Sequence, residues 1–118
     1  MNIPDEAKKL LETRVVAIGT IGDYPNVTPV LYCKVVDNQI IITHNYMEET
    51  LDNIAENKKT CLAVWDDTPN NEYGYKFYGT AEYFPKGKWL AFVKGLKENK
   101  GFPAKGAIVF TPERIKKI

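Results

Sequence analysis

The stretch that decides the fold is Pro25-Asn26-Val27-Thr28-Pro29-Val30-Leu31-Tyr32-Cys33-Lys34-Val35-Val36-Asp37-Asn38-Gln39-Ile40-Ile41-Ile42-Thr43-His44. Apolar and polar side chains alternate over much of its first half, and three isoleucines follow the turn signal Asp37-Asn38. This pattern is typical of two antiparallel strands joined by a short turn. We therefore expect strands at 26–36 and 39–44. Pro29 has no N–H to donate, so it marks a sheet edge or a bulge.

More strands are expected on both sides of this pair. Residues 14–20 are β-branched and apolar and precede the turn Gly22-Asp23-Tyr24-Pro25. Later strands are predicted at 60–65, 73–84 and 107–110, with Gly79 marking a bulge or barrel bend. Helical spacing of apolar residues occurs in three places: after Pro4, from Met47 to about Asn57, and after Pro85.

This order predicts a mainly β fold: a six-stranded antiparallel split β-barrel of Greek-key type with about three short helices. A closed or half-closed barrel is an economical way to remove sheet edges in so short a chain. At 118 residues the chain has the size of one domain with one core, which we place at 1–118.

Composition excludes several classes of function. Lys and Arg number 16 and Asp and Glu 15, so the chain lacks the basic field that drives binding to nucleic acid. No stretch approaches the roughly 18 apolar residues that a membrane span needs. Cys33 and Cys61 are far apart and are expected to be buried, reduced thiols, so the expected compartment is the cytoplasm.

No catalytic constellation appears, and we assign no catalytic residue. His44 is the only histidine, which argues against a metal site and against a triad, and no glycine-rich nucleotide loop is present. Glu48 and Glu49 lie at a predicted helix start, where negative charge complements the helix dipole. The strand end Thr43-His44-Asn45 leads into that helix, whose free N–H groups suit an anion.

Four segments together resemble the pyridoxamine-phosphate-oxidase-like FMN-binding split barrels. They are Pro25-Asn26-Val27-Thr28-Pro29, Ile42-Thr43-His44-Asn45-Tyr46, Thr50-Leu51-Asp52-Asn53-Ile54 with the following Glu56-Asn57-Lys58, and Gly74-Tyr75-Lys76-Phe77-Tyr78-Gly79-Thr80-Ala81. The resemblance covers nearly the whole chain. It implies a homodimer with two FMN sites, each built from both subunits.

The resemblance also implies which residues hold the cofactor. The flavin ring would lie against Thr28, Pro29, Val30, Thr43 and His44, and Thr50 would bond the phosphate. The partner's aromatic side chains, Trp89 or Phe102, would cover the ring or simply pack the interface. The cofactor-binding candidates are thus Thr28, Pro29, Val30, Lys34, Thr43, His44, Asn45, Glu49, Thr50 and Trp89. Lys34 is included because its positive charge could offset the carboxylates of Glu48 and Glu49 near the phosphate.

The chain departs from the family at Met47-Glu48-Glu49, where relatives usually carry a basic residue. Three functions therefore remain open: an FMN-binding oxidoreductase or electron carrier, a reductase that binds a deazaflavin or another nucleotide, and a cofactor-free dimeric binding module. A separate observation also leads us to expect a dimer. We expect Tyr73, Tyr75, Phe77 and Trp89 to be exposed on so small a barrel unless a second copy covers them.

Overall fold

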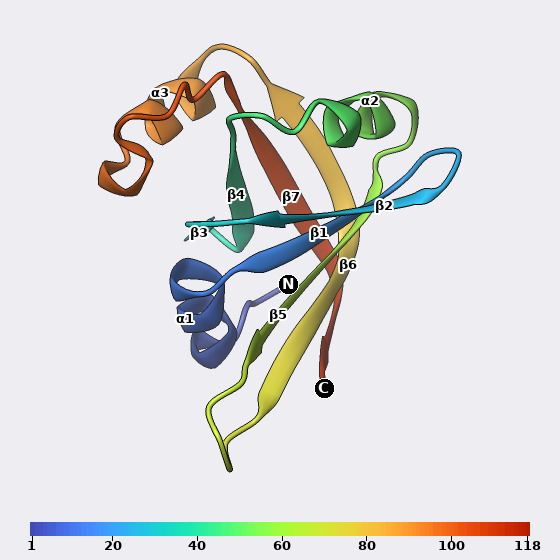
Figure 1. Cartoon of the computed structure of the whole chain (residues 1–118), viewed down its shortest axis with the longest axis vertical. Coiled ribbons are helices and arrows are strands. Elements are labelled where there is room, and N and C mark those ends of the chain that lie inside the picture. The colour runs from blue at the N-terminus through green and yellow to red at the C-terminus, as the bar shows by residue number, and fades with distance from the viewer.

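The structure, a computed structural model that describes residues 1–118, is organised around one antiparallel sheet (Figure 1). Its seven strands run in the order β2-β1-β5-β6-β7-β4-β3. Their bounds are β1 (Val16–Ile21), β2 (Pro25–Val30), β3 (Lys34–Val36), β4 (Gln39–His44), β5 (Lys59–Asp66), β6 (Tyr73–Phe84) and β7 (Gly106–Lys117). The sheet is unclosed: its two edge strands, β2 and β3, follow one another in the chain but do not pair.

The count of seven strands corrects the six that the sequence predicted. The strand expected at 26–36 is two strands, because β2 pairs with β1 whereas β3 pairs with β4. Tyr32 lies between them with φ of 61°, a left-handed conformation that no strand contains. Pro29 does lie in an edge strand, as predicted, where its missing N–H costs no ladder bond on the open side.

The two longest strands, β6 and β7, pair with each other near the centre of the sheet. β7 extends to Lys117, well past the predicted end at Phe110. Its register against β6 shifts between Tyr78 and Gly79, which confirms the predicted irregularity at Gly79. Pro112 lies opposite Gly79 at this bulge, so the strand continues through a proline.

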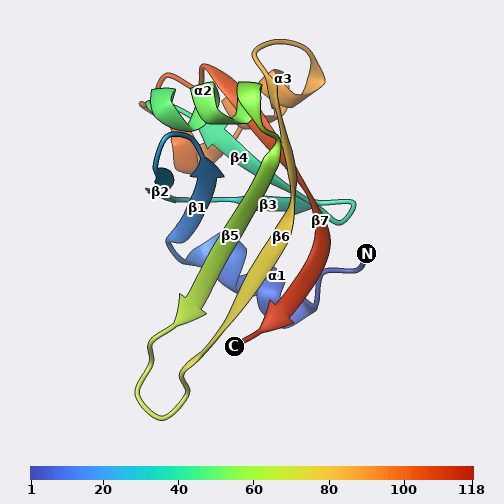
Figure 2. The same ribbon diagram turned by 90° about the vertical axis from the view of Figure 1, so that its right-hand side faces the viewer.

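Three helices flank the sheet, as predicted: α1 (Asp5–Thr13), α2 (Glu48–Glu56) and α3 (Lys88–Lys94), followed by the 3₁₀ turn η1 (Lys97–Asn99). In Figure 2, α2 and α3 lie at one end of the sheet, and the β5–β6 hairpin extends toward the other. None of the helices combines the length and apolar character that a membrane crossing requires.

The main core lies between the sheet and the helices α1 and α2, and a smaller cluster lies under α3. Tyr75 and Phe77 belong to this core, so they do not need a second copy to cover them, contrary to the expectation from sequence. Tyr73 and Trp89 are half-buried. Cys33 is buried as expected, but Cys61 is exposed because it faces outward from β5.

Candidate functional site

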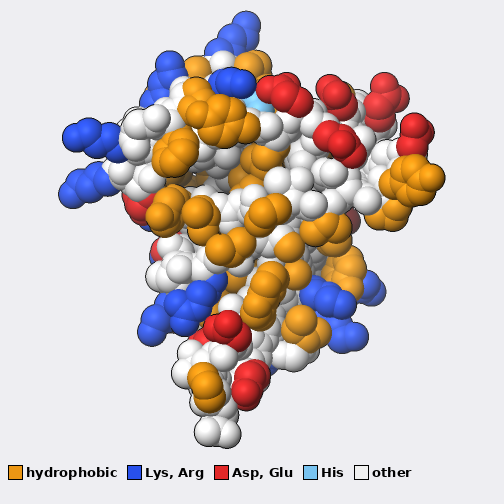
Figure 3. Space-filling view, in the orientation of Figure 1, with side chains coloured by type: hydrophobic (Ala, Val, Ile, Leu, Met, Phe, Trp, Pro, Cys, Tyr) orange, Lys and Arg blue, Asp and Glu red, His pale blue; other side chains and the backbone are white.

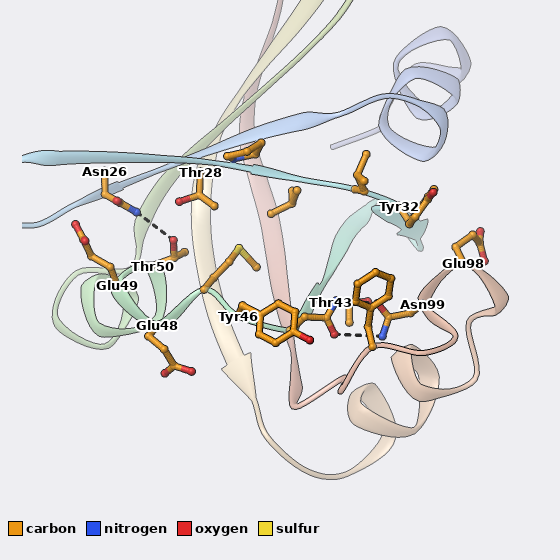
Figure 4. A pocket seen from close by; sticks show the side chains of 16 residues that line it. Asn26, Thr28, Tyr32, Thr43, Tyr46, Glu48, Glu49, Thr50, Glu98 and Asn99 are labelled. Carbon is orange, nitrogen blue, oxygen red and sulfur yellow. Dashed lines mark hydrogen bonds between the residues drawn. The ribbon is translucent and has the colours of Figure 1, made fainter.

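A cavity of about 530 Å³ lies between β2, the end of β4, the start of α2 and the segment 98–102 (Figure 4). Residues of the edge strand β2 form one wall, and the α2 N-terminus forms one end. Seven of the predicted site residues line it: Thr28, Pro29, Val30, Thr43, Asn45, Glu49 and Thr50. The structure therefore brings most of the predicted set together in one place.

Three predicted residues do not line the cavity. His44 follows Thr43 in a strand, so the two side chains point to opposite faces of the sheet. Lys34 forms an ion pair with Glu98, which does line the cavity. Trp89 packs edge to face with Phe92 on α3, within the smaller cluster.

Hydrogen bonds tie the α2 end of the cavity to the β1–β2 hairpin. Asn26 donates from Nδ2 to the buried hydroxyl of Thr50 over 3.1 Å and to Thr20 over 3.4 Å. Asn53, on the next turn of α2, donates to the same Thr20 oxygen over 3.0 Å. The main-chain N–H groups of Glu49 and Thr50 have no backbone acceptor, as expected in the first turn of a helix. This end therefore offers N–H and O–H donors to a ligand.

A pair of asparagines closes the opposite end. Asn45 and Asn99 exchange side-chain hydrogen bonds of 2.8 Å and 3.3 Å, and the N–H of Ala104 donates to Asn45 Oδ1 over 2.9 Å. These bonds hold the segment 97–104 against the end of β4. The same segment contributes Glu98 and Phe102 to the cavity. The hydrogen bond from Lys34 lowers the pKa of Glu98 below its ordinary value.

His44 lies beneath the start of α2, with its side chain 3% exposed. The Tyr83 hydroxyl is 2.9 Å from Nδ1, while Nε2 has no hydrogen-bond partner and lies 3.6 Å from Glu48 Oε1. Burial lowers the pKa of His44, and the nearby Glu48 carboxylate opposes that shift. Lys105 lies 3.5 Å from the same Glu48 oxygen. Glu48 is therefore engaged by groups outside the cavity, and in Figure 4 its carboxylate points away from the cavity.

Several lining residues were not predicted from the sequence: Asn26, Leu31, Tyr32, Tyr46, Met47, Glu48, Glu98 and Asn99, with Phe102 expected only from the partner. Asn26 is two residues before Thr28 in the same strand, so its side chain lies on the same face as that of Thr28. Strand periodicity could therefore have identified it. Glu98 and Asn99 lie in the short 3₁₀ turn η1 that follows α3. Nothing in their local pattern places them beside β2.

Apolar side chains cover most of the outer face of β2, β1 and β5, and the exposed Lys59 of β5 lies at its border. Strand pairing and alternation place nine uncharged residues on this face: Pro25, Val27 and Pro29 of β2, Ala17, Gly19 and Ile21 of β1, and Cys61, Ala63 and Trp65 of β5. We call it the outer apolar face. A second hollow, of about 460 Å³, opens on it beside Gly19 and Cys61. Pro29 lies both on this face and at the cavity, so the two surfaces meet.

A family model for pyridoxamine 5'-phosphate oxidase matches residues 3–118, nearly the whole chain. The chain belongs to this family. A protein of Methanocaldococcus jannaschii, itself uncharacterised, is 34% identical over 120 residues, covering 92% of this chain and 76% of the relative. The predicted resemblance is thereby confirmed.

Solved structures share the fold. HupZ of Group A Streptococcus superposes with a TM-score of 0.87 at 26% identity, covering 99% of this chain and 94% of HupZ. An FMN-binding protein from Syntrophomonas wolfei gives 0.77 at 18% identity, covering 97% and 84%. An F420 reductase gives 0.73 at 21% identity, covering 97% and 98%. The fold thus occurs in proteins named for different cofactors.

The cavity fits a flavin in size and in its mixture of apolar and polar lining. Pockets for small ligands and cofactors fall in the range of roughly 300–1,000 Å³, and this one lies within it. Val30, Leu31 and Met47 offer apolar surface to a ring, while Thr28, Thr43 and the α2 amides offer polar groups. No lysine or arginine lines the cavity, so its donors to an anion are all neutral.

Proposed function

We propose that the protein binds a flavin-class cofactor in the cavity between β2 and α2 and uses it in electron transfer or in a reductase reaction. The observation that carries the proposal is the convergence of seven predicted cofactor-binding residues on one cavity in a chain of this family. FMN is the first ligand to test, given the FMN-binding protein that shares the fold. A deazaflavin is the second, given the F420 reductase.

The roles of the chain's own residues follow from their positions. Thr28, Pro29 and Val30 would support one face of the ring, because they form a wall of the cavity on a strand with an open edge. The Thr50 hydroxyl and the N–H groups at the α2 start would hold the chain that extends from the ring. The flavin supplies the redox chemistry, and the protein supplies orientation and the exclusion of water.

We also propose that the site is completed by a second copy of the chain. The outer apolar face extends over three adjacent strands, with Lys59 only at its border, and it meets the cavity at Pro29. Val27 is 68% exposed and Trp65 48% in the single chain. Contiguous apolar surface of this kind is a common mark of a protein interface. A symmetric dimer would bury it and bring partner side chains to the cavity mouth.

Cofactor binding is tested by titrating the purified, ligand-free protein with FMN and with F420 and following the quenching of their fluorescence. We expect saturable binding of at least one with a stoichiometry of one per chain. Thr50→Val should weaken binding because it removes the hydroxyl and keeps the shape; Thr13→Val, on the exposed side of α1, is the control. If neither compound binds at ligand concentrations approaching millimolar, the cofactor proposal fails.

The dimer is tested by sedimentation velocity at micromolar protein concentration. We expect wild type to sediment as a dimer and Val27→Asp as a folded monomer with reduced cofactor affinity, because a charge on the outer apolar face would be buried unpaired. Asn71→Asp, in the exposed β5–β6 loop, adds the same charge away from this face and should stay dimeric. A monomeric wild type would refute the shared site.

A further inference from the structure

The electrostatic character of the cavity comes from three carboxylates, Glu48, Glu49 and Glu98, with no lysine or arginine among the lining residues. In Figure 3, acidic side chains gather over the part of the molecule that contains α2. Two of the three are engaged elsewhere. Glu98 pairs with Lys34, and Glu48 lies within 3.6 Å of both His44 and Lys105. Glu49 has no ion-pair partner. It is therefore the one carboxylate of the cavity whose charge no neighbouring cation offsets.

Glu49 also differs from Glu48 in direction. In Figure 4 its side chain extends toward β2 and Asn26, beside Thr50, whereas Glu48 turns away from the cavity. The unpaired charge thus lies next to the donors that would otherwise make the α2 start attractive to an anion. Those donors are neutral: they are main-chain N–H groups and the Thr50 hydroxyl, whose oxygen accepts a hydrogen bond from Asn26.

From this arrangement we infer that Glu49 is a specificity residue that disfavours an anionic group at the α2 end, so that the cavity takes an uncharged flavin in preference to its phosphorylated counterpart. The inference rests on the proposed function, since it concerns the ligand of the same cavity. A hydroxylated side chain without phosphate can donate to the Glu49 carboxylate and accept from the α2 N–H groups. A phosphate gains the same N–H bonds but meets the unpaired charge.

The test compares riboflavin with FMN, which differ by the phosphate alone. Dissociation constants are measured by fluorescence quenching with wild type, Glu49→Gln and the control Glu56→Gln. Glu56 is exposed at the far end of the same helix and does not line the cavity. We expect wild type to bind riboflavin at least as tightly as FMN. Glu49→Gln should tighten FMN on the order of five- to tenfold, the effect of removing one partly hydrated like charge, and leave riboflavin unchanged. Glu56→Gln should change neither.

Salt supplies a second measurement that needs no variant. Raising the ionic strength from about 0.05 M to about 0.5 M should strengthen FMN binding to wild type relative to riboflavin, because screening weakens the repulsion. Tighter binding of FMN by tenfold or more at low salt, with no response to Glu49→Gln, would overturn the inference and leave the flavin proposal standing. Failure of both compounds and of F420 to bind would overturn the flavin proposal and this inference with it.

Discussion

The bulge between β6 and β7 should make Gly79 intolerant of any side chain. A Cβ added at this position would lie 2.1 Å from the Thr111 carbonyl oxygen and 3.0 Å from Pro112 Cα. Both contacts are main-chain atoms within a paired ladder, so neither can rotate away as a side chain would. Overpacking typically costs about 1–3 kcal/mol. A clash with backbone on this scale places Gly79→Ala at or above the upper end.

This loss converts into a measurable shift in melting temperature. For 118 residues, an unfolding entropy of about 2.1 cal/mol/K per residue gives about 0.25 kcal/mol/K. A loss of about 3 kcal/mol therefore lowers Tm by about 12 °C. The assay is thermal unfolding by circular dichroism, with Gly95→Ala as the matched control. A Cβ there meets nothing closer than 3.6 Å, and Gly95 has right-handed helical φ and ψ, so that variant should keep or slightly raise Tm. A Gly79→Ala protein that melts within about 2 °C of wild type would refute the close approach on which the fold's bend depends.

Three further predictions concern the site. Burial lowers the pKa of His44, so at mildly acidic pH the unfolded chain binds a proton that the folded chain does not. The free energy of unfolding should therefore fall as the pH drops below about 6.5. Urea unfolding at pH 7.5 and 5.5 measures this dependence, which His44→Gln should reduce. Cys61 should react with DTNB faster in Val27→Asp than in dimeric wild type, whereas Cys33, whose pKa burial raises to about 12, should react in neither until the protein unfolds. Asn45→Ala removes three hydrogen bonds and should cost about 1–3 kcal/mol and speed hydrogen exchange in residues 97–104, while leaving α1 protected.

The local pattern of apolar residues and turn signals predicted most of the helices and strands. It failed where the choice of pairing partner determines where a strand ends. The sequence from 26 to 36 alternates almost without interruption, so nothing local shows that β2 and β3 pair with different neighbours. The left-handed turn at Tyr32 is unexpected for an aromatic residue. Similarly, Pro112 indicates the end of a strand when the sequence is considered alone. In the structure it lies within β7, opposite Gly79 at the bulge.

The candidate site shows the same division. Residues on β2 and at the α2 start were predictable because a strand end that leads into a helix is a local feature. The far wall was not, because Asn99 reaches Asn45 across 54 positions of sequence, through an irregular segment that has no period. His44 was placed with Thr43 on the cavity side, although adjacent residues in a strand face opposite ways. Strict use of that rule would have separated them.

The acidic turn at Glu48 and Glu49 has a different meaning once the two side chains are separated in space. In sequence they form one negative feature at a helix start, which opposes a phosphate as a unit. In the structure Glu48 lies beside His44 and Lys105, and Glu49 alone faces β2. On our inference, a ligand would therefore meet one unpaired carboxylate rather than two, which would disfavour a phosphorylated flavin relative to an unphosphorylated one without excluding a flavin from the cavity. At the level of single side chains, the departure from the family pattern at Glu48 and Glu49 therefore bears on which form of a flavin the cavity would bind, rather than on whether it would bind one.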